Sequence, residues 1–293
     1  MSDLVTIGHR DLTARINPLG AELWSLTDAQ GREYMTDADP KFWTGHAPVL
    51  FPIVGELKGG TYSLDGTEYP LSRHGFARRS QFELVEHREY VARFRLTDSD
   101  ETRAVYPFAF VLELTFRITG MELELEASVR NPGDAPLPFS FGFHPAFAWP
   151  LPDGGEKLAH QIIFACDEPL DIRRLDANGL VAHDAISPIV GNRLSLRPEL
   201  FEDDAMILDE LHSRRLRYES QSGTPRLEIA FPDTPYLGIW QKPGAHYICI
   251  EPWQGLADED DFTGDFREKR GIVNLPPGQV HTMRVDVTVV PAD

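Results

Sequence analysis

The amino-acid sequence predicts an all-β protein built as one large antiparallel sandwich. Apolar and polar residues alternate with a period of two along several segments, which is the pattern of half-buried strands. Turn-forming residues are frequent, with 23 glycines and 23 prolines among 293 residues, and helical periodicity is scarce. All-β chains of this length commonly fold as one unit, and no Pro/Gly/Ser-rich linker divides this one. We therefore expect a single domain over residues 1–293.

The first clear element is a short hairpin. Asp65-Gly66 separates two strand-like runs at 62–64 and 69–71, and this dipeptide favours the tight turn of an antiparallel pair. Alternation then predicts a strand over 90–96.

Two long alternating segments follow and predict a second hairpin. Apolar residues share one face of 108–118 and of 121–129, and Thr119-Gly120 supplies the turn between them. The outer face of the later segment is acidic. Further along, the sequence predicts a short helical turn at 197–201 and strands over 227–231 and 283–289.

The charge balance excludes some partners. Lys and Arg total 28 and Asp and Glu total 46, so the formal net charge is −18. Nucleic acids and anionic membrane surfaces would be repelled, so we expect neither as a partner. Part of this charge lies in the segment 257–265, which we interpret as an exposed acidic loop.

The two cysteines, Cys166 and Cys249, cannot form a disulfide framework and lack the spacing of a zinc site. We expect both to be reduced, buried thiols. The N-terminus has no signal-peptide pattern, and the longest apolar stretch, 47–54, is far too short to span a bilayer. We therefore expect a cytoplasmic protein.

Common catalytic motifs are missing. The sequence contains no G-x-G-x-x-G, P-loop, H-E-x-x-H or G-x-S-x-G pattern, which removes support for dinucleotide, P-loop, zincin and serine-elbow chemistry. The remaining candidates are polar residues embedded in strand-like apolar runs.

Two such runs end in candidate functional side chains. In 139–145, three phenylalanines share one face while Ser140, Gly142 and His144 share the other, so small side chains leave room for a ligand beside the imidazole. In 247–253, Glu251 ends an apolar strand, where burial would raise its pKa and suit it to base catalysis. The alternatives are a structural histidine and a salt bridge from Glu251 to an arginine.

Two further segments are candidates for binding. The first, 73–78, combines Arg73, His74 and Arg78 around a glycine, and surface charge is its alternative interpretation. The second contains Asp203 and Asp204 ahead of an apolar run, where they either bind hydroxyl groups or act as a cap.

Together these segments resemble the aldose 1-epimerase (galactose mutarotase-like) family, and specifically its bacterial LacX-like branch. The similar stretches appear in the family's order along nearly the whole chain. They are Gly20-Ala21-Glu22-Leu23, residues 47–55, His74-Gly75-Phe76-Ala77-Arg78, Gly142-Phe143-His144-Pro145, residues 203–208, Lys242-Pro243-Gly244-Ala245 and Cys249-Ile250-Glu251-Pro252-Trp253.

The resemblance implies an antiparallel β-supersandwich with a sugar site on a concave sheet face. It implies that His144 is the general acid and Glu251 the general base, coexisting near neutral pH as imidazolium and carboxylate. It places His74 and Arg78 in the site and favours Asp204 over Asp203 as a hydroxyl acceptor. It also implies that no metal or organic cofactor is needed.

The expected activity is the interconversion of α and β anomers of an aldose, and the expected partner is a small carbohydrate, bound by a monomer or homodimer. A neutral sugar suits the charge distribution best. A hexose 6-phosphate is the alternative, for which Arg73, Arg78 and Lys242 would form a cationic pocket, although Thr44-Gly45-His46 stands where such relatives typically carry an arginine. A non-catalytic sugar-binding protein and a glycoside hydrolase using Asp204 with Glu251 are further alternatives.

Overall fold

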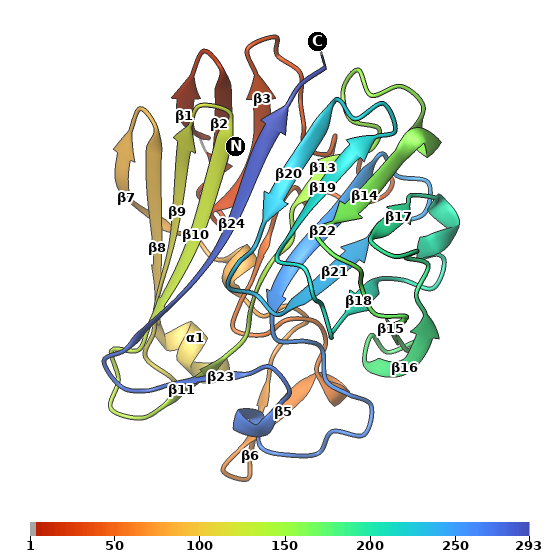
Figure 1. The fold of residues 1–293 in the computed structure, drawn as a ribbon. Coiled ribbons are helices and arrows are strands. Elements are labelled where there is room, and N and C mark those ends of the chain that lie inside the picture. The colour runs from red at the N-terminus through yellow and green to blue at the C-terminus, as the bar shows by residue number, and fades with distance from the viewer. Residues whose placement is uncertain (1–3, 293) are drawn as a thin grey trace.

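Two large antiparallel sheets make up most of the molecule (Figure 1). The computed structural model describes residues 4–292, without the side chains of His9 and His183. The larger sheet has nine strands in the order β17-β14-β19-β20-β24-β10-β9-β8-β7. Their bounds are β7 Glu83–Arg88, β8 Val91–Thr97, β9 Val111–Thr119, β10 Glu122–Arg130, β14 His160–Phe164, β17 Arg193–Ser195, β19 Arg215–Ser220, β20 Arg226–Ala230 and β24 Val280–Val290.

The second sheet has eight strands, with β16-β15-β18-β21-β22-β12-β4 in order and β13 also pairing with β22. Their bounds are β4 Val49–Leu50, β12 Phe141–Phe143, β13 Ala146–Ala148, β15 Asp171–Leu175, β16 Val181–Ile186, β18 Met206–Leu208, β21 Tyr236–Trp240 and β22 Tyr247–Gln254. The all-β fold class predicted from the sequence is confirmed.

Smaller elements cover the ends of the sandwich. The strands among them are β1 Val5–His9, β2 Leu12–Asn17, β3 Glu22–Asp28, β5 Thr61–Leu64, β6 Thr67–Pro70, β11 Leu137–Phe139 and β23 Val273–Leu275. The helix α1 spans Asp100–Val105, and the 3-10 turns are η1 Lys58–Gly60, η2 Ala77–Arg79, η3 Lys157–Ala159, η4 Pro198–Phe201 and η5 Phe266–Glu268.

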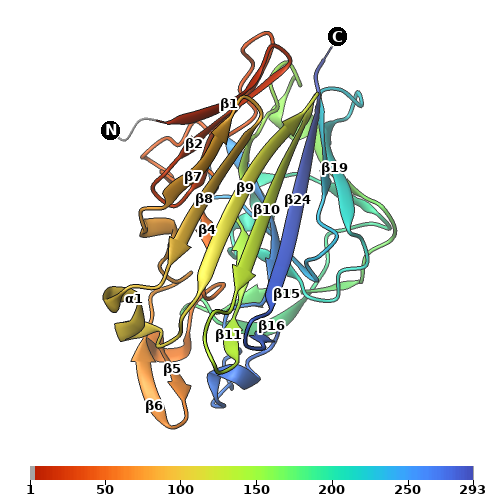
Figure 2. The ribbon, with the colours of Figure 1, turned by 90° about the vertical axis from the view of Figure 1, so that its left-hand side faces the viewer.

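One hydrophobic core joins the two sheets. Phe116 and Val285 of the nine-stranded sheet belong to the same contiguous cluster of buried side chains as Ile239 and Ile250 of the eight-stranded sheet. Figure 2 shows β9, β10 and β24 side by side in one layer. Shared burial of this kind is what holds two sheets face to face.

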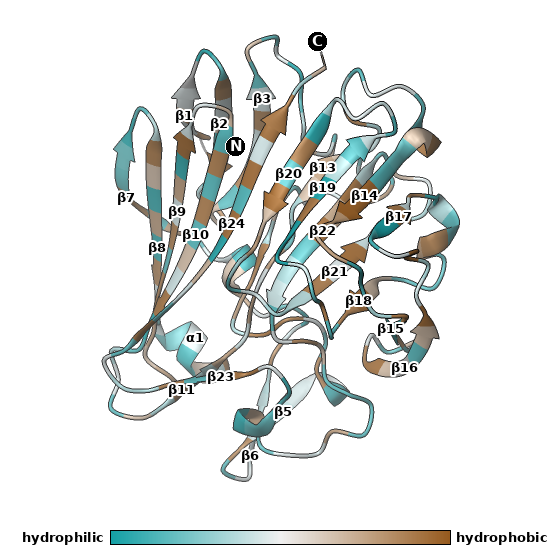
Figure 3. Ribbon diagram, viewed as in Figure 1, coloured by the Kyte–Doolittle hydropathy of each residue, from teal (hydrophilic) through white to brown (hydrophobic). Residues whose placement is uncertain are grey.

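The hairpin of β9 and β10 confirms the period-two prediction. Leu125 pairs with Phe116 across the ladder, and the alternate residues of both strands face the core. Figure 3 shows the resulting hydrophobic and hydrophilic bands. The turn lies at Gly120-Met121, one residue later than predicted, because Glu122 already pairs with Thr119.

The short hairpin of β5 and β6 is also confirmed. Asp65 and Gly66 have φ angles of 50° and 78°, so both adopt the left-handed conformation that a two-residue type I′ turn requires. The predicted helical turn at 197–201 is η4, with Pro198 at its start.

Other predictions need correction. Cys166 is exposed, because it follows the end of β14, whereas Cys249 is buried as predicted. The predicted strand through 139–144 is broken, since the Ser140 amide leaves the ladder and donates to the carbonyl of Pro52 at 2.8 Å. The three phenylalanines of this segment still reach the core.

The helix α1 was not predicted. It is six residues long and begins with a capping box, in which Ser99 and Thr102 satisfy each other's backbone amides. The helix is too short, and contains too few apolar residues, for a helical period to be visible in the sequence. Within residues 4–292, no helix is long and apolar enough to cross a membrane.

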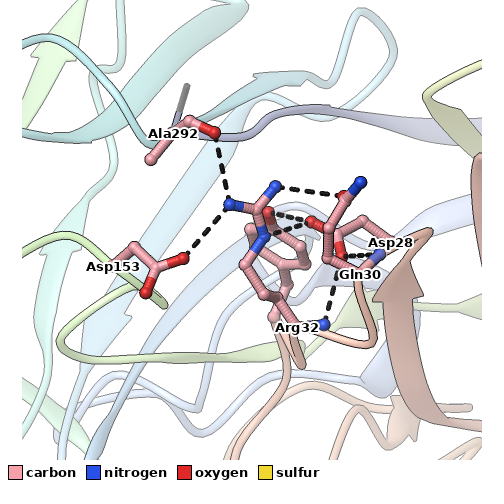
Figure 4. A network of polar contacts seen from close by, with 6 residues as sticks. Asp28, Gln30, Arg32, Asp153 and Ala292 are labelled. Atoms are coloured by element: carbon pink, nitrogen blue, oxygen red, sulfur yellow. Dashed lines mark hydrogen bonds and ion pairs between the residues drawn. The ribbon is translucent and has the colours of Figure 1, made fainter.

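A polar network fastens the turn after β3 to distant parts of the chain (Figure 4). Arg32 Nε lies 2.7 Å from Asp28 Oδ2, and Arg32 Nη1 donates to Asp153 Oδ2 at 3.1 Å and to the carbonyl of Ala292 at 3.2 Å. The N-terminal three-stranded sheet is thereby tied to the C-terminal end of the sandwich.

Candidate functional site

A cavity of about 300 Å³ opens on the eight-stranded sheet. Its wall includes Ile207 of β18, Trp240 of β21 and Glu251 of β22. Small-molecule pockets commonly have volumes of roughly 300–1,000 Å³, so this one suits a small ligand. Every site residue predicted from the sequence lines it, namely Arg73, His74, Arg78, His144, Asp204, Lys242 and Glu251.

His144 and Glu251 face each other across two paired segments. The register that pairs Gly142 with Trp253 and Ala146 with Cys249 brings His144 opposite Glu251. His144 Nε2 lies 3.2 Å from Glu251 Oε2, and the two side chains are 9% and 2% exposed. No arginine in the described part of the chain lies within 4.0 Å of Glu251, so the salt-bridge alternative does not hold.

Aromatic rings hold His144 in place. Its ring centroid lies 5.0 Å from that of Trp43, 5.9 Å from that of Trp240 and 6.0 Å from that of His74. Nδ1 of His144 is buried and has no hydrogen-bond partner. Ring packing, rather than a hydrogen bond to Nδ1, therefore orients this imidazole toward Glu251.

Burial controls the protonation of the pair. It raises the pKa of Glu251 well above 4.5, an effect that the charge of Asp204 reinforces and that of Arg73 opposes. Burial also lowers the pKa of His144 to about 3. Burial thus acts against both charges of the carboxylate–imidazolium pair expected from the sequence, because desolvation penalises each charged form.

His74 is held in an unusual backbone conformation beside the pair. Its φ angle is 66°, which is uncommon for a residue with a side chain. Nδ1 of His74 accepts a hydrogen bond from the Gly55 amide at 3.0 Å, and the His74 amide donates to the carbonyl of Gly55 at 2.8 Å. Nδ1 is therefore an acceptor, so a neutral His74 carries its proton on Nε2.

The cationic side chains of the cavity are unpaired. Within residues 4–292, no carboxylate lies within 4.0 Å of the charged groups of Arg73, Arg78 or Lys242. Burial lowers the pKa of Arg78 to about 10, and the charges of Arg79 and Arg73 act in the same direction. Lys242 is exposed, whereas the two arginines are partly buried.

Of the two candidate aspartates, only Asp204 lines the cavity. Its φ angle is 62°, and its Oδ1 accepts the amide of Ala205 at 2.8 Å. The guanidinium of Arg174 donates to the carbonyls of Asp204 and Leu200, both at 2.9 Å, which fixes the loop.

Sequence reasoning missed most of the aromatic wall. The cavity is lined by Trp43, Trp240 and Trp253. Three of the 5 tryptophans of the chain therefore line the cavity, and the rarity of tryptophan could have marked them as candidate site residues. Gly142 needs a correction, since a side chain there would collide with Trp253 rather than with a ligand.

The segment 257–265 also needs a correction. Asp260 and Asp261 are exposed as predicted, but Ala257 lines the cavity and Asp258 is buried. Asp258 is buried, contrary to the prediction of an exposed loop, because it forms an ion pair with Lys269. Lys269 Nζ lies 2.5 Å from Asp258 Oδ1.

One group of side chains in the described residues has metal-ligand spacing. The ligand atoms of His144, Cys249 and Glu251 lie within 4.8 Å of one another. Burial raises the pKa of the Cys249 thiol well above 9.0, which disfavours the thiolate that metal binding needs. Cys249 belongs to a buried cluster with Ala146 and Tyr247, and we assign it to packing.

Comparison with known proteins identifies the family. The sequence profile of the family described as aldose 1-epimerase matches residues 3–270. The chain belongs to the aldose 1-epimerase family. It is 30% identical to the plasmid-encoded protein LacX of Lactococcus lactis subsp. lactis over 296 aligned residues, which cover 98% of this chain and 99% of LacX.

Solved structures support the same assignment. A galactose mutarotase related enzyme from Lactobacillus acidophilus superposes with a TM-score of 0.91 at 33% identity, covering 98% of this chain and 97% of that one. A galactose mutarotase-like protein from Lactobacillus casei superposes with a TM-score of 0.90 at 30% identity, covering 98% and 100%. The resemblance inferred from the sequence motifs is confirmed.

Proposed function

We propose that this protein is a cofactor-independent aldose 1-epimerase that interconverts the α and β anomers of an aldose. The observation that carries the proposal is the buried His144–Glu251 pair, with its 3.2 Å separation, at the wall of a cavity of monosaccharide size. Membership of an isomerase family supports an enzyme of this class.

The reaction needs one base and one acid. The base removes the proton from the C1 hydroxyl while the acid protonates the ring oxygen, so the C1–O5 bond breaks and the free aldehyde forms. The C1–C2 bond rotates, and the reverse proton transfers close the ring on the other face of C1. Since one proton is taken and one is given, a pair that carries a single proton is sufficient.

Within this proposal, the remaining cavity residues bind and orient the sugar. Asp204 accepts hydrogen bonds from hydroxyl groups, and the partly buried arginines donate to them. His74 presents its Nε2–H as a further donor. The indole rings of Trp43 and Trp240 provide apolar surface for a face of the sugar and limit the access of water to the acid–base pair.

A phosphorylated aldose is a second candidate substrate, favoured by one specific observation. The cavity is lined by Arg73, Arg78 and Lys242, which have no ion-pair partner in the part of the chain that the structure describes, although acidic residues outnumber basic ones 46 to 28 in the chain. Unpaired cations at a cavity wall are suited to a phosphate group.

Anomer exchange on a panel of free and 6-phosphorylated aldoses, followed by NMR or polarimetry, tests both candidates. We expect acceleration with at least one sugar, and a loss of about 10²–10⁴-fold in kcat for His144→Ala and Glu251→Gln. Glu219→Gln, which removes a buried carboxylate on β19 of the other sheet, is the matched control and should stay active.

The outcomes separate the alternatives. Sugar binding in calorimetry without anomer exchange would support a non-catalytic sugar-binding protein. Release of a reducing sugar from a glycoside would support hydrolysis. Exchange that is unaffected by both His144→Ala and Glu251→Gln would overturn the assigned pair.

A further inference from the structure

A buried ion pair lies directly behind the cavity wall. Lys269 Nζ is 2.5 Å from Asp258 Oδ1, and the two side chains are 2% and 5% exposed. Among the described residues, Lys269 is the one lysine or arginine that is buried. Burying a cation is costly unless it is paired, so this lysine requires Asp258 in one defined position.

Asp258 connects this ion pair to the backbone of two other segments. Its Oδ2 accepts the amide of Lys58 at 2.8 Å, and its own amide donates to the carbonyl of Glu56 at 2.9 Å. Its carbonyl accepts the amide of Val181 at 2.8 Å. Apart from Lys269, the partners are thus main-chain groups of Glu56, Lys58 and Val181, in place of other ionised side chains.

The segment held by Asp258 is the one that orients His74. Gly55 precedes Glu56, and a side chain at Gly55 would come within 2.5 Å of Ala257, so the two segments are in close contact. The amide of Gly55 donates to His74 Nδ1, and the carbonyl of Gly55 accepts the His74 amide. An unbroken series of contacts therefore runs from Lys269 through Asp258 and Gly55 to His74.

We propose that the Lys269–Asp258 ion pair is a positioning device that holds Gly55 against Ala257 and thereby fixes the orientation and tautomer of His74 in the cavity. The effect of this ion pair on catalysis rests on the proposed epimerase function, but its effect on the orientation and tautomer of His74 does not. Directional, buried polar contacts suit this role, because they specify one arrangement of the loops where apolar packing would tolerate several.

The test uses the double variant Asp258→Asn/Lys269→Met, which removes both buried charges and leaves an amide oxygen to accept the Lys58 amide. Imidazole ¹⁵N NMR, with the signal of His74 assigned from a His74→Asn spectrum, reports its tautomer. In the wild type we expect the single Nε2–H tautomer. In the variant we expect a mixture of tautomers, with kcat/KM lowered roughly tenfold, since small misplacements in a site have large effects on rate.

Controls separate positioning from stability. Glu219→Gln removes a buried charge in the other sheet and should leave the His74 signals unchanged. Asp258→Asn/Lys269→Gln, which keeps a hydrogen bond between two neutral side chains, is the milder variant, to be used if the first double variant does not fold, and should shift the tautomer to a smaller extent.

A folded variant with the wild-type His74 tautomer would overturn the proposal, whatever its activity. If the wild type shows no anomer exchange, the epimerase function fails while the NMR result still decides the positioning role. A wild-type tautomer combined with lower thermal stability would show that the ion pair only stabilises the fold.

Discussion

Glu251, the proposed catalytic carboxyl, is buried at a cost in stability once it is ionised. Its side chain is 2% exposed, and burial raises its pKa well above the ordinary 4.5. The native state therefore binds this proton more tightly than the unfolded state does. The contribution of this bound proton to the stability of the native state is complete below pH 4.5. It is lost as the pH rises through the raised pKa of Glu251 in the native state.

We predict that Glu251→Gln stabilises the fold increasingly as the pH rises above 4.5, while it lowers kcat by about 10²–10⁴-fold. Glutamine keeps the shape of the side chain and has no charge to desolvate. Thermal unfolding of wild type and variant at several pH values measures the difference in Tm. A difference that stays constant over the whole pH range would contradict this explanation.

A second prediction concerns the pH profile of anomer exchange. The pair carries one proton between a pH of about 3, where His144 becomes protonated, and the raised pKa of Glu251. We expect kcat/KM to stay level above pH 4.5 and to fall only as the pH rises through the raised pKa of Glu251. With ordinary pKa values of 4.5 and 6.5, the profile would instead be a narrow bell between them.

At the scale of single elements, β22 joins the core to the cavity. Ile248 and Ile250 face the core between the sheets, while Cys249 and Glu251 face the opposite side. This division follows from the alternation of side chains along a strand. The position of Glu251 is therefore as rigid as the packing of the two isoleucines.

The hairpin of β9 and β10 has a different role, since neither strand contributes to the cavity. Phe116 is fully buried, pairs with Leu125 and packs its ring edge-on to Phe94. We predict that Phe116→Ala lowers the free energy of unfolding by about 3–5 kcal/mol, with kcat/KM of the folded enzyme close to wild type. Denaturant unfolding and kinetics check this, with Phe116→Leu as the milder control.

At the scale of the whole molecule, the two sheets share one core cluster. The single domain predicted over residues 1–293 remains a prediction, and the shared core supports it. We expect one cooperative unfolding transition, with the same midpoint by calorimetry, near-UV circular dichroism and tryptophan fluorescence. Since tryptophans line the cavity, a separate transition by fluorescence would indicate that the site region unfolds on its own.

Charge is distributed differently over the surface and the cavity. The net charge of −18 belongs to the chain as a whole, and Glu122, Glu124 and Glu126 contribute acidic side chains on the outer face of β10. The cavity collects cations that have no ion-pair partner among residues 4–292, beside the buried carboxyl of Glu251, whose pKa burial raises. Overall charge therefore leads us to expect no polyanionic partner, but it does not decide between a free and a phosphorylated sugar.

The sequence by itself determined the all-β class, the main hairpins and the family. Alternation of apolar residues and turn dipeptides are local properties of the chain, so they can be read without knowledge of distant contacts. The motifs around His74, His144 and Glu251 likewise lie within short segments, which made these residues predictable.

Only the tertiary structure decided what depends on segments far apart in the chain. The tryptophan wall joins Trp43 to Trp240, and the protonation of Glu251 depends on burial by the whole sheet. Asp258 has a local sequence typical of an exposed loop, yet Lys269 holds it inside. Burial and pairing are set by which distant residues meet, and no local pattern contains that information.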